Sequence, residues 1–393
     1  MAISTMRDLA PGSSIDVARP PASRVSLAAL RRAVAARGLF RLLAEWTQLR
    51  LRRGLKLEEY LALQLYDAAY YGTADKSAFV GLSGARRILI RANSRLDLYG
   101  LVGNKIACDF LLAAHGLPIM PTVALFCETI GMPAAFLLRG ESALRSFLAD
   151  AQRYPLFGKP LIGTQSLGSA SFDRFDPGRQ TLVAFGGGEI ALDAFVRDVA
   201  THYPRGYLFQ RRLSPHRTVR ALCGDRLATV RVLTAATAAG PEVLRAAWKI
   251  PAGANAADNF WRPGNLLAEL DITTGRVQRA MRASPEGFVE VTHHPDTGAA
   301  LVGAVVPRWA RVIDLAREGA AVLKDLPLLG WDIAPVDVEL VEGGAIVVEV
   351  NHVPDFRLHQ IADRRGILDA PLRQFLRERK AQSWAWRRRP ATT

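Results

Sequence analysis

The stretch Gly330–Phe356, GWDIAPVDVELVEGGAIVVEVNHVPDF, decides how the rest of the chain is interpreted. It contains two runs rich in β-branched residues, Val336–Leu340 and Ala345–Val350. Between them, Val341–Gly344 has the glycines of a tight hairpin connection. The sequence therefore predicts two adjacent antiparallel strands.

Three polar side chains belong to these predicted strands. If the strands pair antiparallel, Asp337 lies across from Glu349, and Asn351, two residues further on, faces the same side as Glu349. Converging hard oxygen ligands suit Mg²⁺ or Mn²⁺, which bind through one or two carboxylates and leave other positions to water and nucleotide phosphate. Asp337, Glu349 and Asn351 are thus the candidate metal ligands. The alternative is a solvated hairpin whose acids face water.

Two lysines and a loop of small residues precede this hairpin. Lys105 opens the helical run KIACDFLLAAHGLP, and Lys159 lies in the short predicted strand Leu156–Pro160. The loop after this strand, GTQSLGS, lets backbone N–H groups approach phosphate oxygens, and each lysine adds a point charge. An ordinary surface turn is the alternative for the loop. The candidate phosphate-binding residues are Lys105, Lys159, Gly163, Ser166 and Gly168.

The order of these features resembles the ATP-grasp superfamily, in which an Asp and a later Glu-x-Asn hold the magnesium ions of ATP. The resemblance implies that residues 206–213, GYLFQRRL, form a strand leading into an interdomain hinge that reads adenine. Gln210 would then face the adenine edge, and the backbone of Leu213 would face the ring. Arg211 stands where the hinge normally carries an acid, and an exposed strand end is the alternative for Gln210.

Segments between this strand and the hairpin narrow the resemblance. Arg231 lies in a Thr-x-Arg strand, an Asp-Asn-Phe segment follows at 258–260, and a Gly-Trp-Asp segment at 330–332. This order is similar to the sugar-transfer-associated ATP-grasp family, which is related to α-L-glutamate ligases, and the resemblance covers roughly residues 50 to 365. It implies an α+β protein with the ATP-grasp fold, two α+β lobes with ATP between their sheets, and an N-terminal helical extension.

The predicted domain organisation follows from this resemblance and from composition. The first residues are rich in Pro, Ser and Arg, which favours a flexible segment. The predicted parts are a flexible N-terminus (1–24), a helical extension (25–98), an N-lobe (99–215), a C-lobe with the metal site (216–369) and a basic C-terminal tail (370–393).

The resemblance implies an ATP-dependent ligase that activates a carboxylate as an acyl phosphate and joins it to an amine or similar nucleophile. The product would be a cell-surface glycan or a peptide-like metabolite. Lys159 and Arg231 are the candidate catalytic residues, because positioned cations stabilise charge on the transferred phosphoryl group. Two alternatives stay open, because a fold does not dictate its acceptor. They are a kinase acting on a hydroxyl and a non-catalytic ATP-binding scaffold at a membrane glycan-assembly complex.

Composition is typical of a folded cytoplasmic enzyme. The chain has 393 residues, 49% of them hydrophobic, enough to bury a substantial core. Its cysteines, Cys108, Cys127 and Cys223, lie in apolar segments without metal-binding spacing and are expected to be reduced core residues. No apolar run is long enough to span a membrane, and the start MAISTMRDLAPGSS lacks the apolar core of a signal peptide.

The net charge of +14 requires a partner beyond ATP or a large solvated surface. Residues 25–53 alternate apolar residues with arginines, and the tail sets Trp384 and Trp386 beside Arg387–Arg389. Both termini are candidates for peripheral contact with an anionic membrane surface. The alternative is a packed helix with a solvated basic face, followed by a disordered tail. Nucleic acid is disfavoured, because no recognisable binding motif accompanies the charge.

Overall fold

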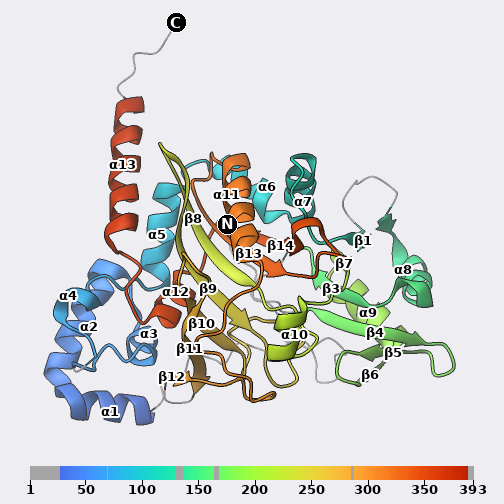
Figure 1. Ribbon diagram of the computed structural model, residues 1–393, viewed down its shortest axis with the longest axis horizontal. Coiled ribbons are helices and arrows are strands. Elements are labelled where there is room, and N and C mark those ends of the chain that lie inside the picture. The colour runs from blue at the N-terminus through green and yellow to red at the C-terminus, as the bar shows by residue number, and fades with distance from the viewer. Residues whose placement is uncertain (1–26, 69, 129–135, 163–167, 285–286, 388–393) are drawn as a thin grey trace, which may run out of the picture. The chain divides into compact units, whose positions relative to one another are not determined.

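The computed structural model describes residues 27–387, except 69, 129–135, 163–167 and 285–286. The side chains of residues 73, 74 and 381–387 are also outside this description. The described chain forms two compact units, residues 120–213 and residues 27–119 with 214–387. Each unit packs helices against a sheet, which confirms the predicted α+β class (Figure 1).

The smaller unit, residues 120–213, is a seven-stranded sheet in the order β2-β1-β7-β3-β4-β5-β6. The pair β1 and β2 is parallel, and the other neighbours are antiparallel. Helices α8 and α9 pack on the sheet through an aromatic core that includes Phe147 and Phe195. Its elements are β1 (Thr122–Phe126), β2 (Leu137–Leu138), α8 (Gly140–Leu148), β3 (Leu156–Pro160), β4 (Ala170–Asp176), β5 (Thr181–Ala184), β6 (Glu189–Ala191), α9 (Leu192–His202) and β7 (Tyr207–Arg211).

The larger unit contains a second seven-stranded sheet, in the order β12-β11-β10-β9-β8-β13-β14. All neighbouring strands in it are antiparallel. The strands are β8 (Val230–Thr237), β9 (Gly240–Ile250), β10 (Leu266–Leu270), β11 (Val277–Ser284), β12 (Gly287–Val291), β13 (Leu328–Pro335) and β14 (Ala345–Asn351).

Helices cover both faces of this second sheet, as the alternation of its side chains requires. In β9, Ala246 and Trp248 belong to the core with helix α11 (Trp309–Val322), whereas Ala247 between them belongs to the core of the N-terminal helices. Helix α12 (Phe356–Asp363) lies against β9, β10 and β11. Figure 1 shows α11 along one face of the strands and α12 with the N-terminal helices on the other.

The described residues of 27–114 are mainly helical, and this segment extends beyond the predicted helical extension (25–98). They pack on the second sheet and belong to the larger unit. Their helices are α1 (Leu27–Arg37), α2 (Leu39–Arg53), α3 (Leu57–Ala62), α4 (Thr73–Lys76), α5 (Leu82–Ala92), α6 (Tyr99–Gly103) and α7 (Lys105–Ala114). The remaining helices of this unit are α10 (Arg217–Cys223) and the C-terminal α13 (Ala370–Arg387).

The predicted register of the 336–350 hairpin is wrong. The first strand is β13, which ends at Pro335, and Asp332 rather than Asp337 pairs with Glu349. Every residue of β13 is buried, so this strand lacks the alternation that marks a half-exposed strand in a sequence. The VDVEL segment does alternate, but only Val336 still bonds across the hairpin, to the Gly344 carbonyl, and residues 338–340 form a turn in the connection to β14.

Candidate active site

The described part of the candidate site is centred on the end of β14. Glu349 and Asn351 both lie there, and the Glu349 side chain retains 34% of its exposure. The Lys105 ammonium stands 3.6 Å from Glu349 Oε1. The amide nitrogen of Asn351 is buried and has no hydrogen-bond partner among the described residues. Since a buried polar group without a partner is costly, this amide indicates a position prepared for a ligand.

Lys105 reaches this position because the start of α7 is fixed. Asn104 is its N-cap residue, and its side chain accepts a hydrogen bond from the backbone N–H of Ala107 at 3.2 Å. The predicted helix is therefore confirmed, with Lys105 as its first residue. Just beyond β14, the His352 ring packs on Tyr99 of α6 with 4.5 Å between ring centroids. Burial lowers the pKa of His352, so its imidazole is neutral at pH 7.

Arg231 lies next in the ladder and is bound to Asp332. Its Nε and Nη2 donate to the two carboxylate oxygens of Asp332 at 2.6 and 2.9 Å. Strand register causes this pairing, since Asp332 stands opposite Arg231 on one side and Glu349 on the other. Burial opposes ionisation of Asp332, but Arg231 and Lys249 lower its pKa to about 2. Nη1 is the guanidinium nitrogen of Arg231 that does not bond to Asp332.

A second buried pair extends this charged row. Lys249 Nζ lies 3.2 Å from Asp332 Oδ2 and 3.4 Å from Asp258 Oδ1. Asp258 also accepts hydrogen bonds from the backbone and hydroxyl of Thr229. Burial raises the pKa of Asp258, although Lys249 acts in the opposite direction. The row Glu349, Asp332, Arg231, Lys249 and Asp258 thus extends across four strands and one loop of the same unit. Within it, the contacts Arg231–Asp332–Lys249–Asp258 alternate in charge.

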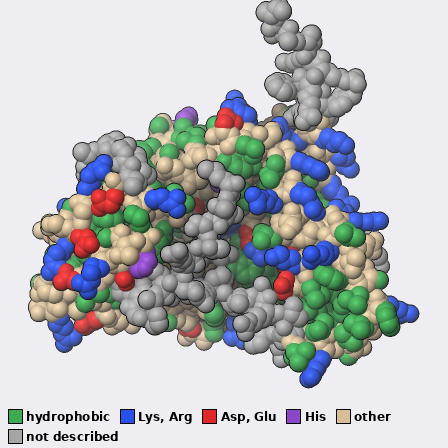
Figure 2. All heavy atoms as spheres, turned by 180° about the vertical axis from the view of Figure 1, so that it is seen from behind, with side chains coloured by type: hydrophobic (Ala, Val, Ile, Leu, Met, Phe, Trp, Pro, Cys, Tyr) green, Lys and Arg blue, Asp and Glu red, His purple; other side chains and the backbone are tan. Residues whose placement is uncertain are grey.

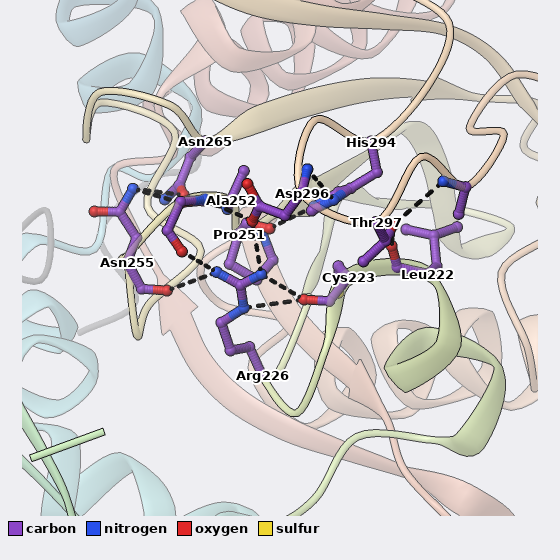
Figure 3. A network of polar contacts seen from close by, with 12 residues as sticks. Leu222, Cys223, Arg226, Pro251, Ala252, Asn255, Asn265, His294, Asp296 and Thr297 are labelled. Carbon is purple, nitrogen blue, oxygen red and sulfur yellow. Dashed lines mark hydrogen bonds and ion pairs between the residues drawn. The ribbon is translucent and has the colours of Figure 1, made fainter. Parts of the chain in front are cut away.

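A polar network holds the loop that carries Asp258. Arg226 donates to the carbonyl oxygens of Cys223 and Gly253 and pairs with Asp296, as Figure 3 shows. Asn265, buried at the end of the loop, donates to the carbonyl oxygens of Ala257 and Asn259 at 2.8 Å each. These bonds fix the backbone on both sides of Asp258. The Asp-Asn-Phe segment is therefore a positioned loop.

The smaller unit contains the other predicted site residues. Lys159 is half-buried on β3, which has the predicted bounds, and Leu213 is half-buried after β7. Gln210 is 1% exposed and donates to the Met120 carbonyl at 3.5 Å, which excludes an exposed strand end. Gly168 has φ +74°, and a Cβ there would lie 2.1 Å from Tyr203 Oη, so glycine is required. Gly163 and Ser166 lie outside the described residues.

Asp337 is not part of this row. It lies in the loop after β13, where it accepts a hydrogen bond from the backbone N–H of Arg217 at 3.1 Å. Five residues of extended strand correspond to about 16 Å, so Asp337 stands far from the position opposite Glu349. Within the described residues no group of three His, Cys, Asp or Glu side chains can hold a metal. A magnesium site here would use one or two carboxylates with the Asn351 amide oxygen and water, which fits the donor set.

Sequence reasoning assigned no role to Asp332, Lys249 or Asp258. The sequence did contain a signal that could have identified Asp332 and Asp258 as site residues, because both lie in segments that carry the family resemblance. Lys249 had none, since its neighbours Asp258 and Asp332 come from a loop and a non-adjacent strand.

Comparison with known proteins identifies the family. A family model described as sugar-transfer associated ATP-grasp matches residues 85–375. The chain belongs to this family. The predicted ATP-grasp fold is thereby confirmed. No curated protein matches this ATP-grasp chain.

Three solved structures illustrate the likeness in fold. N5-carboxyaminoimidazole ribonucleotide synthetase in its ADP complex is 12% identical over 66% of this chain and 46% of its own, with a TM-score of 0.36. The D-alanine–D-alanine ligase from Coxiella burnetii is 11% identical over 73% and 60%, with a TM-score of 0.40. Biotin carboxylase from Campylobacter jejuni is 10% identical over 79% and 53%, with a TM-score of 0.41. The ATP-grasp chain thus spans 46–60% of these proteins.

The structure also bears on two further predictions, for the cysteines and for membrane-spanning helices. Cys108, Cys127 and Cys223 are buried and form no disulfide bond, which confirms them as reduced core residues. None of the helices in the described residues is long and apolar enough to cross a membrane.

Proposed function

We propose that this protein is an ATP-dependent carboxylate–amine ligase that forms ADP. The observation that supports it is the Lys105–Glu349 contact beside the unpartnered amide of Asn351. A cation, an accessible carboxylate and an unsatisfied amide together match the needs of a metal-bound nucleotide phosphate. Membership in an ATP-grasp family supports ATP as the nucleotide.

The proposed metal ligands are Asp332, Glu349 and Asn351, with Asp332 in place of Asp337. Asp332 pairs with Glu349 in the ladder, whereas Asp337 lies in the following loop. Each oxygen of a carboxylate has two lone pairs, so Asp332 can bind Arg231 and Lys249 and still offer one lone pair of Oδ1 to a metal ion. Mg²⁺ or Mn²⁺, when bound, would neutralise phosphate charge there.

The remaining residues bind and orient the reacting groups. Lys105 and Lys159 neutralise phosphate oxygens, with Gly163, Ser166 and Gly168 as the proposed phosphate loop and Gln210 and Leu213 as the proposed adenine contacts. Asp332 holds Arg231 in one orientation and presents its Nη1 edge to the transferred phosphoryl group. A cation fixed before the reaction needs no reorganisation as charge develops, which lowers the barrier.

The proposed chemistry has two steps. A substrate carboxylate oxygen attacks the γ-phosphorus of ATP, ADP leaves, and an acyl phosphate forms. The amine nitrogen then attacks the acyl carbon, phosphate leaves, and the amine loses a proton. We propose that the product is a cell-surface glycan component or a peptide-like metabolite made in the cytoplasm.

We also propose peripheral contact with the inner face of an anionic membrane through the basic termini. The C-terminal segment has its tryptophans and arginines within 381–393, whose side chains lie outside the description. Deleting residues 381–393 should weaken co-sedimentation with anionic vesicles and leave ADP formation unchanged. Equal sedimentation of both forms would remove the tail from this proposal.

A substrate screen tests the ligase proposal. Pairs of carboxylates and amines are scored by ADP release, and the product is identified by mass spectrometry. The proposal requires release of ADP and phosphate that depends on Mg²⁺, together with a product lighter by one water than its two precursors. A phosphorylated hydroxyl product would indicate a kinase instead. ATP binding without turnover on any pair would favour the scaffold.

A further inference from the structure

Helix α2 has apolar residues on two opposite faces. Leu42 and Leu49 are 1% and 7% exposed and pack into the core of the N-terminal helices. Phe40, Leu43 and Leu51 are 86%, 39% and 74% exposed. At about 100° per residue, Leu51 lies within about 20° of Phe40 around the helix, whereas Leu49 lies about 180° away. The outward face therefore carries an apolar stripe, with Phe40 and Leu43 near one end, Leu51 at the other and the exposed Thr47 between them.

Two further exposed leucines lie on α1 and α2. Leu27 on α1 is 61% exposed, and Leu39 at the start of α2 is 48% exposed. In the view from behind, Figure 2 shows hydrophobic side chains gathered at the lower right with Lys and Arg around them, in the region of α1 and α2. Scattered apolar residues are ordinary on a protein surface, but a contiguous patch rimmed by polar groups marks an interaction site.

Basic side chains flank the stripe on both sides. Residues 27–53 contain seven arginines and a single acid, Glu45. Around the helix, Arg41 and Arg52 lie about 100–120° from Phe40 in one direction, and Arg50 about 80° in the other. All three are exposed. The sides of the apolar stripe therefore carry positive charge.

The one acid of this segment is directed away from the stripe. Glu45 accepts hydrogen bonds from Lys76 Nζ at 2.9 Å and from the Tyr60 hydroxyl at 2.7 Å. It also pairs with Arg37 at 3.4 Å. With Glu45 neutralised inside the unit, no negative charge in this segment offsets the exposed arginines.

We infer that α2 docks in the plane of an anionic lipid surface, with Phe40, Leu43 and Leu51 inserted and Arg41, Arg50 and Arg52 at the level of the headgroups. An apolar stripe flanked by arginines on an otherwise packed helix matches the requirements of an interfacial helix. Arginine stems reach along apolar surface while their charge stays in water. A second copy of the chain fits less well, because it presents the same positive charge.

This inference rests on the proposed membrane contact of the basic termini and assigns that contact to α2. It uses none of the residues proposed to bind nucleotide or metal. Docking there would hold the enzyme at a membrane and bring it near lipid-linked or surface-bound substrates. Vesicle binding can be measured without ATP or substrate, so its failure and the failure of the ligase proposal are distinguishable.

Co-sedimentation of the full chain with vesicles tests the inference. The intact protein should sediment with vesicles of phosphatidylglycerol and phosphatidylcholine and not with phosphatidylcholine alone. Phe40→Ser with Leu51→Ser should weaken binding to the anionic vesicles at least about tenfold, because both side chains lose their apolar insertion. The matched control is Ile272→Ser with Val302→Ser, two side chains that are each 44% exposed elsewhere in the same unit. This control should bind as the intact chain does.

Charge is tested by a second pair of variants. Arg41→Glu with Arg52→Glu should lower binding to anionic vesicles by at least about tenfold and reduce the sensitivity of the remaining binding to salt, because less electrostatic attraction is left to screen. Arg197→Glu with Arg205→Glu makes the same change in net charge at exposed positions of the other unit and should have a much smaller effect. Circular dichroism and the unfolding temperature establish that each variant is folded.

Several results would overturn the inference. One is an intact chain that fails to bind anionic vesicles. Another is a Phe40/Leu51 variant that is folded and binds as tightly as the intact chain or its apolar control. A third is a concentration-dependent dimer that the Phe40/Leu51 substitutions convert to monomer while vesicle binding persists, which would assign the stripe to a second copy of the chain.

Discussion

Two rows of charged residues that include strands of the second sheet both contain buried ion pairs. They differ in how much of the hydrogen-bonding capacity of their polar atoms is already used. The first row contains Glu349, Asp332 and Arg231, and it includes an accessible carboxylate. The second contains Arg245 and Asp363, where Arg245 bonds Asp363, Asp369 and the Gly366 carbonyl. Both rows are buried ion pairs in the same unit.

The volume of the adjacent cavity alone would favour the second row as a ligand-binding site. It lines a cavity of about 650 Å³, within the range that small-molecule sites occupy. Yet its charges are mutually satisfied: Glu269 is bound by Arg279 and Arg365 at 3.3 and 3.2 Å. The first row ends beside the unpartnered amide of Asn351. A buried ion pair therefore indicates structure, and unused bonding capacity beside it indicates function.

The comparison predicts its largest effect at Glu349. Glu349→Gln should reduce ADP formation by about a hundredfold to a thousandfold, because it removes a negative charge beside Lys105 and from the proposed metal site. The unfolding temperature should barely change, since the side chain is partly exposed. Glu269→Gln in the second row is the matched control and should keep its turnover. Loss of activity in Glu269→Gln alone would reverse the assignment of the two rows.

Asp363 tests the structural role of the second row. Asp363→Ala leaves the buried Arg245 without its main partner and should lower the free energy of unfolding by about 3–5 kcal/mol. Urea denaturation measures this loss. Asp97→Ala breaks an exposed pair with Arg95 and should have little effect. If Asp363→Ala is as stable as Asp97→Ala, the second row does not stabilise the fold.

His359 lies on α12 between the two rows and has a predicted pH effect. Both ring nitrogens are buried without a partner among the described residues. Burial, with Arg231 and Arg245 nearby, lowers the pKa of His359 to about 3. The unfolded state therefore binds a proton below about pH 6.5 that the folded state rejects until about pH 3, so stability falls as pH falls through this window. Between pH 7 and 4 the loss is on the order of a few kcal/mol.

His359→Leu should remove that part of the acid destabilisation. The measurement is the free energy of unfolding in urea at pH 7 and pH 4. The exposed His202→Leu serves as control and should lose stability with acid as the intact protein does. An unchanged pH dependence in His359→Leu would mean that the imidazole is not excluded from protonation.

Asp332 and Asp337 give the smallest predicted contrast, between a residue of the first row and a loop residue outside it. Asp332→Asn should lower turnover by about a hundredfold, because it removes a ligand charge and loosens Arg231. Asp337→Asn should cost only a few-fold, because it changes a loop residue bound to a backbone N–H. Steady-state ADP formation compares them directly. The reverse ranking would restore Asp337 to the metal site.

Local signals predicted much of this molecule from sequence. The strand Leu156–Pro160 and the start of the Lys105 helix depend on neighbouring residues, and both have the predicted bounds. Strand β14 (Ala345–Asn351) was also predicted, as Ala345–Val350, from its β-branched residues. These elements include four of the candidate site residues, Lys105, Lys159, Glu349 and Asn351.

Pairing between distant strands was harder to predict. The ladder that places Asp332 opposite Glu349 contains an irregularity between Asp332 and Ile333, where the register shifts by one residue. A fully buried strand offers no alternation from which to read that shift. The Lys249–Asp258 pair likewise arises from β9 and the loop after it folding back, which no local spacing signals.

The most direct test follows oxygen from the carboxylate to phosphate. A carboxylate selected by the substrate screen is labelled with ¹⁸O in both oxygens and incubated with ATP, Mg²⁺ and its amine. The account predicts that each phosphate released carries one ¹⁸O, and that Glu349→Gln reduces this transfer in proportion to its loss of ADP formation. Phosphate without label, with both ¹⁸O atoms retained in the product, would contradict an acyl phosphate and with it the proposed ligase.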